Sequence, residues 1–235
     1  MRIHPRYTQG GAVAVLGGAT VLTLMILVFI IFFILEKGLP VINLKFLTTN
    51  PQDMGRAGGI FPTLIGTILL PLLAIIIATP LGIFTSVYLS EYTKENKATR
   101  IIRFGTDCLA GIPSIIFGLF GYIFFVITLG FGWSILSGGL TLAVMILPTI
   151  IRTSEEAIRA VPKSYREVSF SLGATSWQTV KKVILPNALP GIVTGIMLSV
   201  GRSIGETAAV IFTAGSSLRI PESLFDSTRT MAVHF

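Results

Sequence analysis

The sequence predicts an all-α polytopic membrane protein, and its composition and patterning lead to that class. Of the 235 residues, 52% are hydrophobic and only 12% are charged, whereas soluble domains carry about 25% charged residues. The apolar residues lie in uncharged blocks of 19 to 44 residues, which a soluble domain cannot bury. The net charge of +7 then fits lipid headgroups and topology better than a nucleic-acid partner.

The first two predicted spans follow from the lengths of the first uncharged blocks. Residues 11–35 provide 25 residues, or about 37 Å of helix, enough to cross roughly 30 Å of hydrocarbon. The uncharged stretch is also too long for the apolar core of a cleaved signal peptide, so this segment is expected to remain as a span. Residues 57–90 form the second span, in which Pro71 and Pro80 are expected to tilt or kink the helix.

The remaining blocks predict three more spans and the beginning of another. Residues 108–151 are too long for one crossing and are expected to fold as spans three and four, with a turn at Gly130–Ser134. The fifth span, residues 183–201, is expected to continue through Arg202 and Glu206 to about Ala214. A further apolar run starts near Thr230 and stops at Phe235. We therefore expect five full transmembrane helices plus the start of a sixth, in a chain truncated at its C-terminus.

The positions of lysine and arginine predict the orientation in the membrane. Twelve of the 18 basic residues lie in three segments that alternate with three segments holding five. The positive-inside rule places the richer segments, and with them the N-terminus, in the cytoplasm. The richer segments are 1–10, 91–107 and 152–182, and the poorer ones are 36–56, 129–136 and 215–230. A multi-pass protein of the cell (inner or plasma) membrane is expected.

The longest charged stretch, Arg152 to Lys182, predicts a structured loop. Short helices are expected at 153–160 and 163–172, separated by Pro162, and Gly173 is a suitable C-terminal cap for the second. Tyr165, Val168 and Leu172 would share one face of that second helix. A loop that is rigid within itself and bordered by prolines suits the transmission of force to a partner; the alternative is an amphipathic helix that lies on lipid.

This loop also resembles a known motif. Its residues are similar to the EAA loop of ABC importer permeases, E-A-A-x3-G-x9-I-x-L-P, and the resemblance implies the ABC importer type I permease fold (MetI-like). In that family the loop, residues 152–186 here, docks into a groove of an ATPase subunit. The matching positions are Glu167, Val168, Ser169, Gly173, Val183, Leu185 and Pro186, of which Val168, Ser169 and Val183 depart from the pattern.

The chain itself is expected to be non-catalytic. The sequence contains no G-x4-G-K-[ST] pattern, so ATP and Mg are expected to be bound by the partner ATPase subunit, and no cofactor by this chain. With one cysteine, and with its two histidines at opposite ends, the chain is expected to form no intrachain disulfide and no metal site. The sequence also lacks the Asp pair, Ser-His pair or metal motif that an intramembrane enzyme usually needs.

Two charges interrupt the fifth span and predict a path for an anion. Arg202 and Glu206, spaced i, i+4, are expected to lie on one helical face and to pair. The alternatives are that both snorkel to the interface or form a purely structural pair. An arginine fork suits an oxyanion, Thr207 offers a hydroxyl, and Arg152 is a candidate for receiving the anion on exit. Asp107 is expected to pair with Arg103.

Two further segments narrow the resemblance to one group of ABC importer permeases. Gly201–Ala208 resembles the G-R-[AS]-I-G-E-T-A motif of the phosphate-specific ABC importer permeases, the PstA and PstC proteins, and Leu109–Gly121 resembles their third-helix entry. The short N-terminus is closer to the PstA type. The resemblance implies phosphate import; other oxyanions (sulfate, molybdate, phosphonate) remain alternatives, as does, less favoured, an ATP-independent transporter or channel.

The same resemblance implies an assembly and a division of the chain. The expected partners are a PstC-like permease in a heterodimer, a PstB-like ATPase dimer, a PstS-like phosphate-binding protein and membrane lipid, without nucleic acid. Residues 1–58 are expected to form the N-terminal tail, the first span and an external loop. Residues 59–235 are expected to form the permease core.

Overall fold

The computed structural model describes residues 5–93 and 95–234, which are helical along most of their length. The chain divides into two compact units, Met1–Thr49 and Asn50–Phe235. The first contains the 34-residue helix α1 (Pro5–Gly38), a 3-10 turn (Leu39–Val41) and α2 (Leu44–Thr48). Asn43 caps α2, because its side chain accepts a hydrogen bond from the Phe46 N–H at 2.8 Å. The apolar side chains along α1 are exposed, as suits a helix surrounded by lipid.

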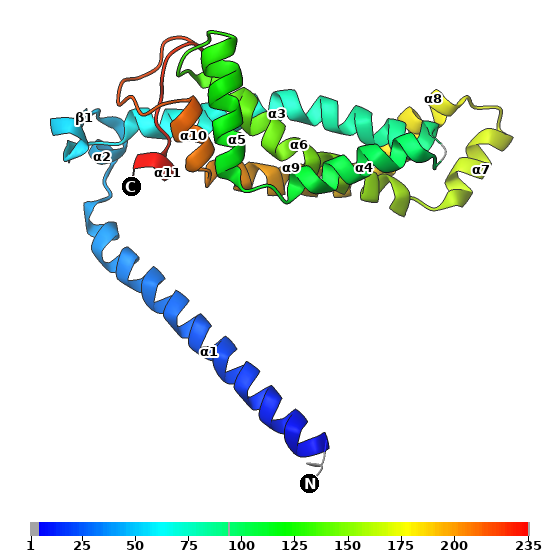
Figure 1. Cartoon of the computed structure of the whole chain (residues 1–235), viewed down its shortest axis with the longest axis horizontal. Coiled ribbons are helices and arrows are strands. Elements are labelled where there is room, and N and C mark those ends of the chain that lie inside the picture. Colours follow the sequence, from blue (N-terminus) through cyan, green and yellow to red (C-terminus); the bar gives the residue numbers. More distant parts are fainter. Residues whose placement is uncertain (1–4, 94, 235) are drawn as a thin grey trace. The chain divides into compact units, whose positions relative to one another are not determined.

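The second unit is built around three long helices. In Figure 1, α3, α6 and α9 run lengthwise and pack along one another. A two-stranded antiparallel hairpin, β1 (Pro51–Gln52) with β2 (Ala57–Gly58), precedes them. The helices are α3 (Phe61–Val87), α4 (Lys97–Ala110), α5 (Ser114–Gly121), α6 (Ile135–Ala160), α7 (Lys163–Ser171), α8 (Ser176–Thr179), α9 (Leu185–Ile204), α10 (Ala208–Thr213) and α11 (Met231–His234).

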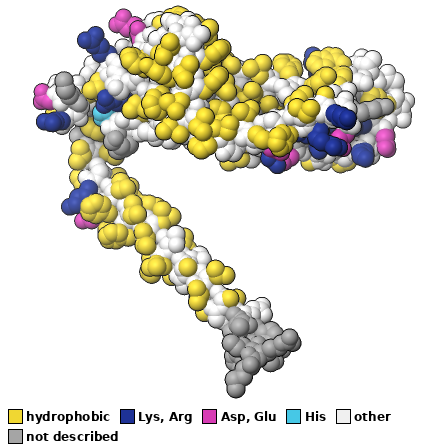
Figure 2. All heavy atoms as spheres, viewed as in Figure 1, with side chains coloured by type: hydrophobic (Ala, Val, Ile, Leu, Met, Phe, Trp, Pro, Cys, Tyr) yellow, Lys and Arg dark blue, Asp and Glu magenta, His cyan; other side chains and the backbone are white. Residues whose placement is uncertain are grey.

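Two apolar clusters hold this unit together. The larger lies between α3, α6 and α10 and includes the fully buried Leu70, Leu142 and Ile146. The smaller, with Ile158, Val180 and Ile184, lies where the long helices meet the α7–α8 loop. We call that side of the unit the loop end. Figure 2 shows charged side chains gathered at the two ends of the unit, with hydrophobic side chains over the flank between them, as expected for a bundle that spans a bilayer.

The predicted five full spans agree with the structure when a bent pair of helices is counted as one span. Four helical stretches among the described residues are long and apolar enough to cross a membrane, and the count is five when one bent pair of helices is taken as a single span. The four are 9–41, 61–92, 135–160 and 176–204; the bent pair is α4 with residues 114–128, which are α5 and the π-helical turn Tyr122–Thr128 that continues it.

The third span differs from its prediction. It starts at Lys97 rather than Cys108, and it bends by 101° between α4 and α5, as Figure 1 shows. Asn96 and Thr99 form a capping box that starts α4 upstream of the uncharged block. The bend falls at Gly111–Pro113, because proline lacks an amide hydrogen and disfavours helical conformation in the preceding residue. The uncharged block therefore marked the apolar part of the span rather than its helix ends.

The predicted turn between spans three and four is confirmed. Gly130 and Gly132 have φ values of +69° and +65°, the left-handed region that glycine adopts without strain. The Ser134 side chain then accepts from the Ser137 N–H at 3.1 Å and starts α6. The separate helix expected at 153–160 is wrong: α6 runs unbroken to Ala160, so this stretch is the last two turns of the fourth span.

Candidate functional site

The loop that follows α6 is a rigid helical hairpin. Helix α7 (Lys163–Ser171) is followed by Gly173, whose φ of +79° lies in the left-handed region that glycine adopts without strain. The turn is closed by backbone hydrogen bonds from Gly173 to Phe170 at 2.9 Å and from Ala174 to Ser169 at 3.2 Å, as in helix C-caps of this kind. The buried hydroxyls of Ser169 and Thr179 share a hydrogen bond of 2.8 Å across the hairpin. These contacts fix α7 against α8.

The hairpin also continues into the membrane without a break. Thr175 is the N-cap of α8, and it forms a capping box with Gln178. A π-helical turn, Val180–Ile184, then joins α8 to α9, so residues 176–204 form one continuous helical stretch. A displacement of the hairpin would therefore be carried directly into the fifth span.

The EAA-like residues divide into an exposed set and an internal set. Val168 and Leu172 are 60% and 83% exposed, and together with Tyr165 and the half-buried Val183 they line a shallow apolar groove. Glu167 is exposed on the same helix. Ser169 instead lies inside the hairpin, Leu185 packs on the smaller apolar cluster, and Pro186 lies in the first turn of α9. The exposed apolar side chains form a surface suited to a partner.

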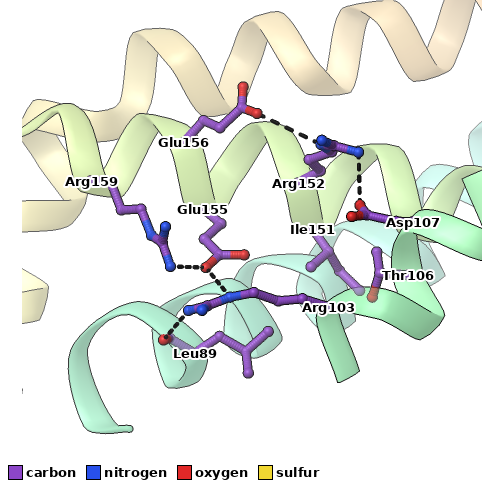
Figure 3. A pocket seen from close by; sticks show the side chains of 9 residues that line it. All are labelled: Leu89, Arg103, Thr106, Asp107, Ile151, Arg152, Glu155, Glu156 and Arg159. Carbon is purple, nitrogen blue, oxygen red and sulfur yellow. Dashed lines mark hydrogen bonds and ion pairs between the residues drawn. The ribbon is translucent and has the colours of Figure 1, made fainter. Parts of the chain in front are cut away.

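Charged side chains of α4 and α6 form a network at the loop end, which Figure 3 shows. Arg103 Nε donates to Glu155 at 2.9 Å, and Arg159 approaches the same carboxylate at 2.7 Å. Arg152 donates to Asp107 at 2.7 Å and lies 3.7 Å from Glu156. The expected Asp107–Arg103 pair is therefore wrong. Helix α4 packs along α6, and each of the two α4 residues pairs with α6 instead of with its neighbour on the same helix.

This network places acidic side chains around Arg152. Its side chain is 56% exposed and lies between the carboxylates of Asp107 and Glu156, so an anion would have to compete with both for the guanidinium. Thr106 and Ile151 also line the hollow at this site. Arg152 is accessible, but its charge is already balanced by the chain's own acids.

The segment that carries Arg202 and Glu206 is broken rather than continuous. Helix α9 ends at Ile204 and α10 begins at Ala208, so the expectation that the fifth helix continues to Ala214 with both charges on one face is wrong. The Glu206 carboxylate is buried and accepts from the Ala209 N–H at 3.3 Å, at the beginning of α10. Among the described residues, no ion pair joins Glu206 to Arg202. Because α9 ends between the two residues, the i, i+4 geometry that would bring this carboxylate to Arg202 is lost.

The break leaves Arg202 exposed in the last turn of an otherwise apolar helix. Thr207, between the two helices, is exposed as well. A guanidinium in this position makes no ion pair with any residue that the structure describes, although insertion of an arginine into a bilayer costs about 2.5 to 3.5 kcal/mol. Its charge therefore requires water, another chain or a ligand.

The comparison with protein families decides what kind of protein this is. Residues 78–233 match the model of the family described as binding-protein-dependent transport system inner membrane component. The chain belongs to this family. The match covers α4 to α10, and therefore includes the α7–α8 hairpin, the charge network and the α9–α10 break.

Relatives and a solved structure agree with that membership. The permease is 36% identical to the probable ABC transporter permease protein YqgI of Bacillus subtilis (strain 168), over 99% of this chain and 83% of that protein. It is 41% identical to the phosphate transport system permease protein PstA 1 of Mycobacterium tuberculosis (strain CDC 1551 / Oshkosh), over 72% of this chain and 55% of that protein. The permease thus spans about half the length of that relative.

The fold agrees with the predicted type I (MetI-like) class. A solved structure titled as an inward facing conformation of the MetNI methionine ABC transporter matches with a TM-score of 0.52 and 27% identity. The match covers 63% of the permease and 68% of that chain. The permease is therefore a multi-pass membrane component of an ABC transport system.

Sequence reasoning missed two residues of the permease that this geometry brings together. Arg166 of α7 binds Glu91, which lies at the end of α3, 75 positions earlier in the chain. No local spacing rule links residues so far apart. The sequence showed only that both charged residues lie in segments expected on the same side of the membrane. That observation does not identify which charges pair.

Proposed function

We propose that this permease is the membrane-spanning subunit of an ATP-driven importer of inorganic phosphate. It would form part of the translocation path and couple to a partner ATPase through loop 152–186. The observation that carries the coupling is the exposed apolar face of α7, with Val168 and Leu172, on a hairpin that continues into α9. An exposed apolar surface on a rigid support is suited to contact with a partner, where such side chains act as anchors. In this proposal the chain is non-catalytic, and the partner ATPase hydrolyses ATP.

Phosphate as the cargo is supported by the relatives and by one residue. Several of the similar proteins are named phosphate transport system permease protein PstA. Arg202 presents a planar fork of donors that matches phosphate oxygens, and it is exposed beside the helix break. Because no carboxylate that the structure describes forms an ion pair with Arg202, none of them competes with the anion for that guanidinium. Thr207 can add a hydroxyl donor, and Arg152 would act later, near release.

In the proposed assembly, partner subunits provide a second permease, the ATPase and a phosphate-binding protein. A PstC-like permease would cover the exposed face of α9 and Arg202, and a PstB-like ATPase dimer would bind ATP and Mg and receive α7. A PstS-like binding protein would deliver phosphate to the end of the bundle opposite the loop end. This arrangement places the loop end and the N-terminus in the cytoplasm, in agreement with the distribution of basic residues.

Uptake of radiolabelled phosphate in a strain lacking the permease tests the cargo. The full-length reading frame should restore uptake, and Arg202→Gln should abolish it while leaving the amount of assembled complex unchanged. Arg219→Gln is the matched control, because Arg219 is an exposed arginine in the segment that follows α10. Excess sulfate, molybdate or phosphonate should not compete.

Two results would contradict the proposal in different ways. Competition by one of those oxyanions, with no uptake of phosphate, would reassign the cargo while keeping the type of transporter. Normal phosphate uptake by Arg202→Gln would remove Arg202 from the path. Uptake that continues after ATP depletion would favour an ATP-independent transporter instead.

A further inference from the structure

The end of α3 is a partly buried junction with other helices. Beyond Val87 the helix continues as a π-helical turn, Tyr88–Tyr92, a form that is rare in proteins and is often found at functional sites. This turn carries Glu91, whose side chain is only 13% exposed. A carboxylate largely shielded from water is stabilised by a partner of opposite charge, since its desolvation is costly.

Arg166 of α7 provides that compensation and binds a third element at the same time. Its Nη2 donates to Glu91 Oε1 at 2.6 Å, and its Nε lies 3.1 Å from Oε2, so the pair is bidentate. Nη1 donates to the carbonyl of Val161 at 2.7 Å, and Nη2 to that of Ile158 at 3.0 Å. Ile158 lies in the last turn of α6, where carbonyl groups lack helical partners, and Val161 is its C-cap. One guanidinium thus joins α7 to the ends of α3 and α6.

The position of Arg166 separates it from the surface suited to a partner. Its side chain is 19% exposed, whereas Val168 and Leu172 on the same helix are mostly exposed. The covalent link between α6 and α7 consists only of Val161 and Pro162, a short connection about which α7 could otherwise pivot. The guanidinium bridges that connection and fixes the angle between the helices.

A second arginine extends the junction to the third span. Arg103 of α4 donates from Nη2 to the Leu89 carbonyl, in the same π-helical turn, at 3.3 Å, and from Nε to Glu155 of α6 at 2.9 Å. The end of α3 is therefore tied to α4, α6 and α7 through two guanidinium groups. A displacement of α7 has a contiguous polar route to each of these helices.

We propose that Glu91 and Arg166 form a transmission clamp, through which movement of α7 displaces the ends of α3 and α6 instead of bending the Val161–Pro162 connection. The clamp is a positioning device and not part of the docking surface. The inference rests on the proposed function, because it specifies how force applied to α7 reaches the spans. Removal of the clamp should leave ATPase binding intact and separate ATP hydrolysis from transport.

The test uses the complete transporter, purified through a tag on the full-length chain and reconstituted in lipid vesicles. The variants are Arg166→Gln, Glu91→Gln, the neutral pair Glu91→Gln/Arg166→Gln, and the exchanged pair Glu91→Arg/Arg166→Glu. Lys163→Gln is the matched control, since Lys163 is an exposed basic residue of α7 with no ion pair among the residues described. Three quantities are measured: ATPase subunit bound per permease, the rate of ATP hydrolysis, and phosphate transported per ATP.

The expected pattern is specific to coupling. Each single variant should retain the ATPase subunit and should transport about tenfold less phosphate per ATP, the scale of energetic coupling through such networks. The exchanged pair should recover part of that ratio, because it restores a charge pair but not the donors to Ile158 and Val161. Lys163→Gln should behave as the unaltered chain.

The outcomes distinguish this inference from the proposed function. An unchanged ratio in Arg166→Gln, in a transporter that imports phosphate, would overturn the clamp alone. If a single variant does not assemble, the neutral pair replaces it, because it leaves no unpaired buried charge, and an unchanged ratio there would likewise overturn the clamp. Absence of an ATPase subunit or of phosphate uptake with the unaltered chain would overturn the proposed function itself.

Discussion

An exchange of one methyl group between α9 and α6 tests how closely these two spans pack. A Cβ atom added at Gly191 would lie 2.6 Å from the Cβ of Ala157 and 3.5 Å from its Cα. Carbon atoms pack best at about 3.5 to 4.0 Å, so Gly191→Ala forces the two helices apart by roughly 1 Å. Overpacking of this kind costs about 1 to 3 kcal/mol in unfolding free energy. Ala157→Gly costs about 1 kcal/mol, the helix propensity difference.

The double variant Gly191→Ala/Ala157→Gly gives the decisive value. The added methyl then meets only the Cα at 3.5 Å, an ordinary contact, and the remaining cost is the glycine in α6. Independent effects would sum to about 2 to 4 kcal/mol, whereas we expect about 1 kcal/mol, so the interaction energy is about 1 to 3 kcal/mol.

Equilibrium unfolding of the detergent-solubilised permease by SDS titration, followed by tryptophan fluorescence, measures these energies. The chain contains two tryptophans, Trp133 and Trp177, which lie near opposite ends of the described bundle. Gly201→Ala is the matched control on α9, because an added Cβ there meets no atom within 4 Å. Additive single effects in the cycle, or a loss in Gly201→Ala as large as in Gly191→Ala, would refute the close packing of α6 and α9.

Three further predictions concern the loop and the helix break. Gly173→Val, at a φ of +79°, should cost at least about 1 to 2 kcal/mol and reduce co-purification of the ATPase subunit, with Gly173→Asn milder because asparagine tolerates this conformation; equal binding by both variants and the unaltered chain would refute it. Leu172→Asp, at a position 83% exposed, should leave the unfolding curve unchanged and abolish that co-purification, and retained binding would remove α7 from the interface. Glu206→Gln should keep the cap on Ala209, whereas Glu206→Ala should lose about 1 kcal/mol in SDS unfolding; equal losses would show that the charge of Glu206 matters instead.

Local chemistry made the loop and the turns predictable. The α7 helix was expected at 163–172 and lies at Lys163–Ser171, because Pro162 and Gly173 limit it on both sides. The turn at Gly130–Ser134 likewise depends on two glycines in left-handed conformation. In both places the residues that cause the structure lie within a few positions of it, so the local sequence is sufficient to predict it.

Pairing of charges was not predictable in the same way. The i, i+4 spacing of Arg103 with Asp107 correctly puts both on one face of α4, but α6 packs against that face and supplies Glu155 and Arg152 at shorter reach. The expected pair of Arg202 with Glu206 requires one continuous helix, but helix α9 ends between these two residues. A local rule fails wherever a tertiary contact or a helix end offers the same group a better partner.

The arginines of this permease therefore differ in what is available to a ligand. Arg103 and Arg166 are mostly buried and bound to carboxylates of other elements, so their interactions hold helices together. Arg152 is accessible, yet Asp107 and Glu156 already balance its charge, and a bound anion would have to displace one of them. Arg202 is exposed at the end of an apolar helix, and it makes no ion pair with Glu206, the nearest acid in the sequence, or with any other residue that the structure describes. Since an anion binds more readily to a cation whose charge is not already neutralised, we propose Arg202 rather than Arg152 as its binding site in the path. Arg152→Gln should consequently slow phosphate uptake less than Arg202→Gln does, and the reverse order would show that the anion displaces the Asp107–Arg152 pair.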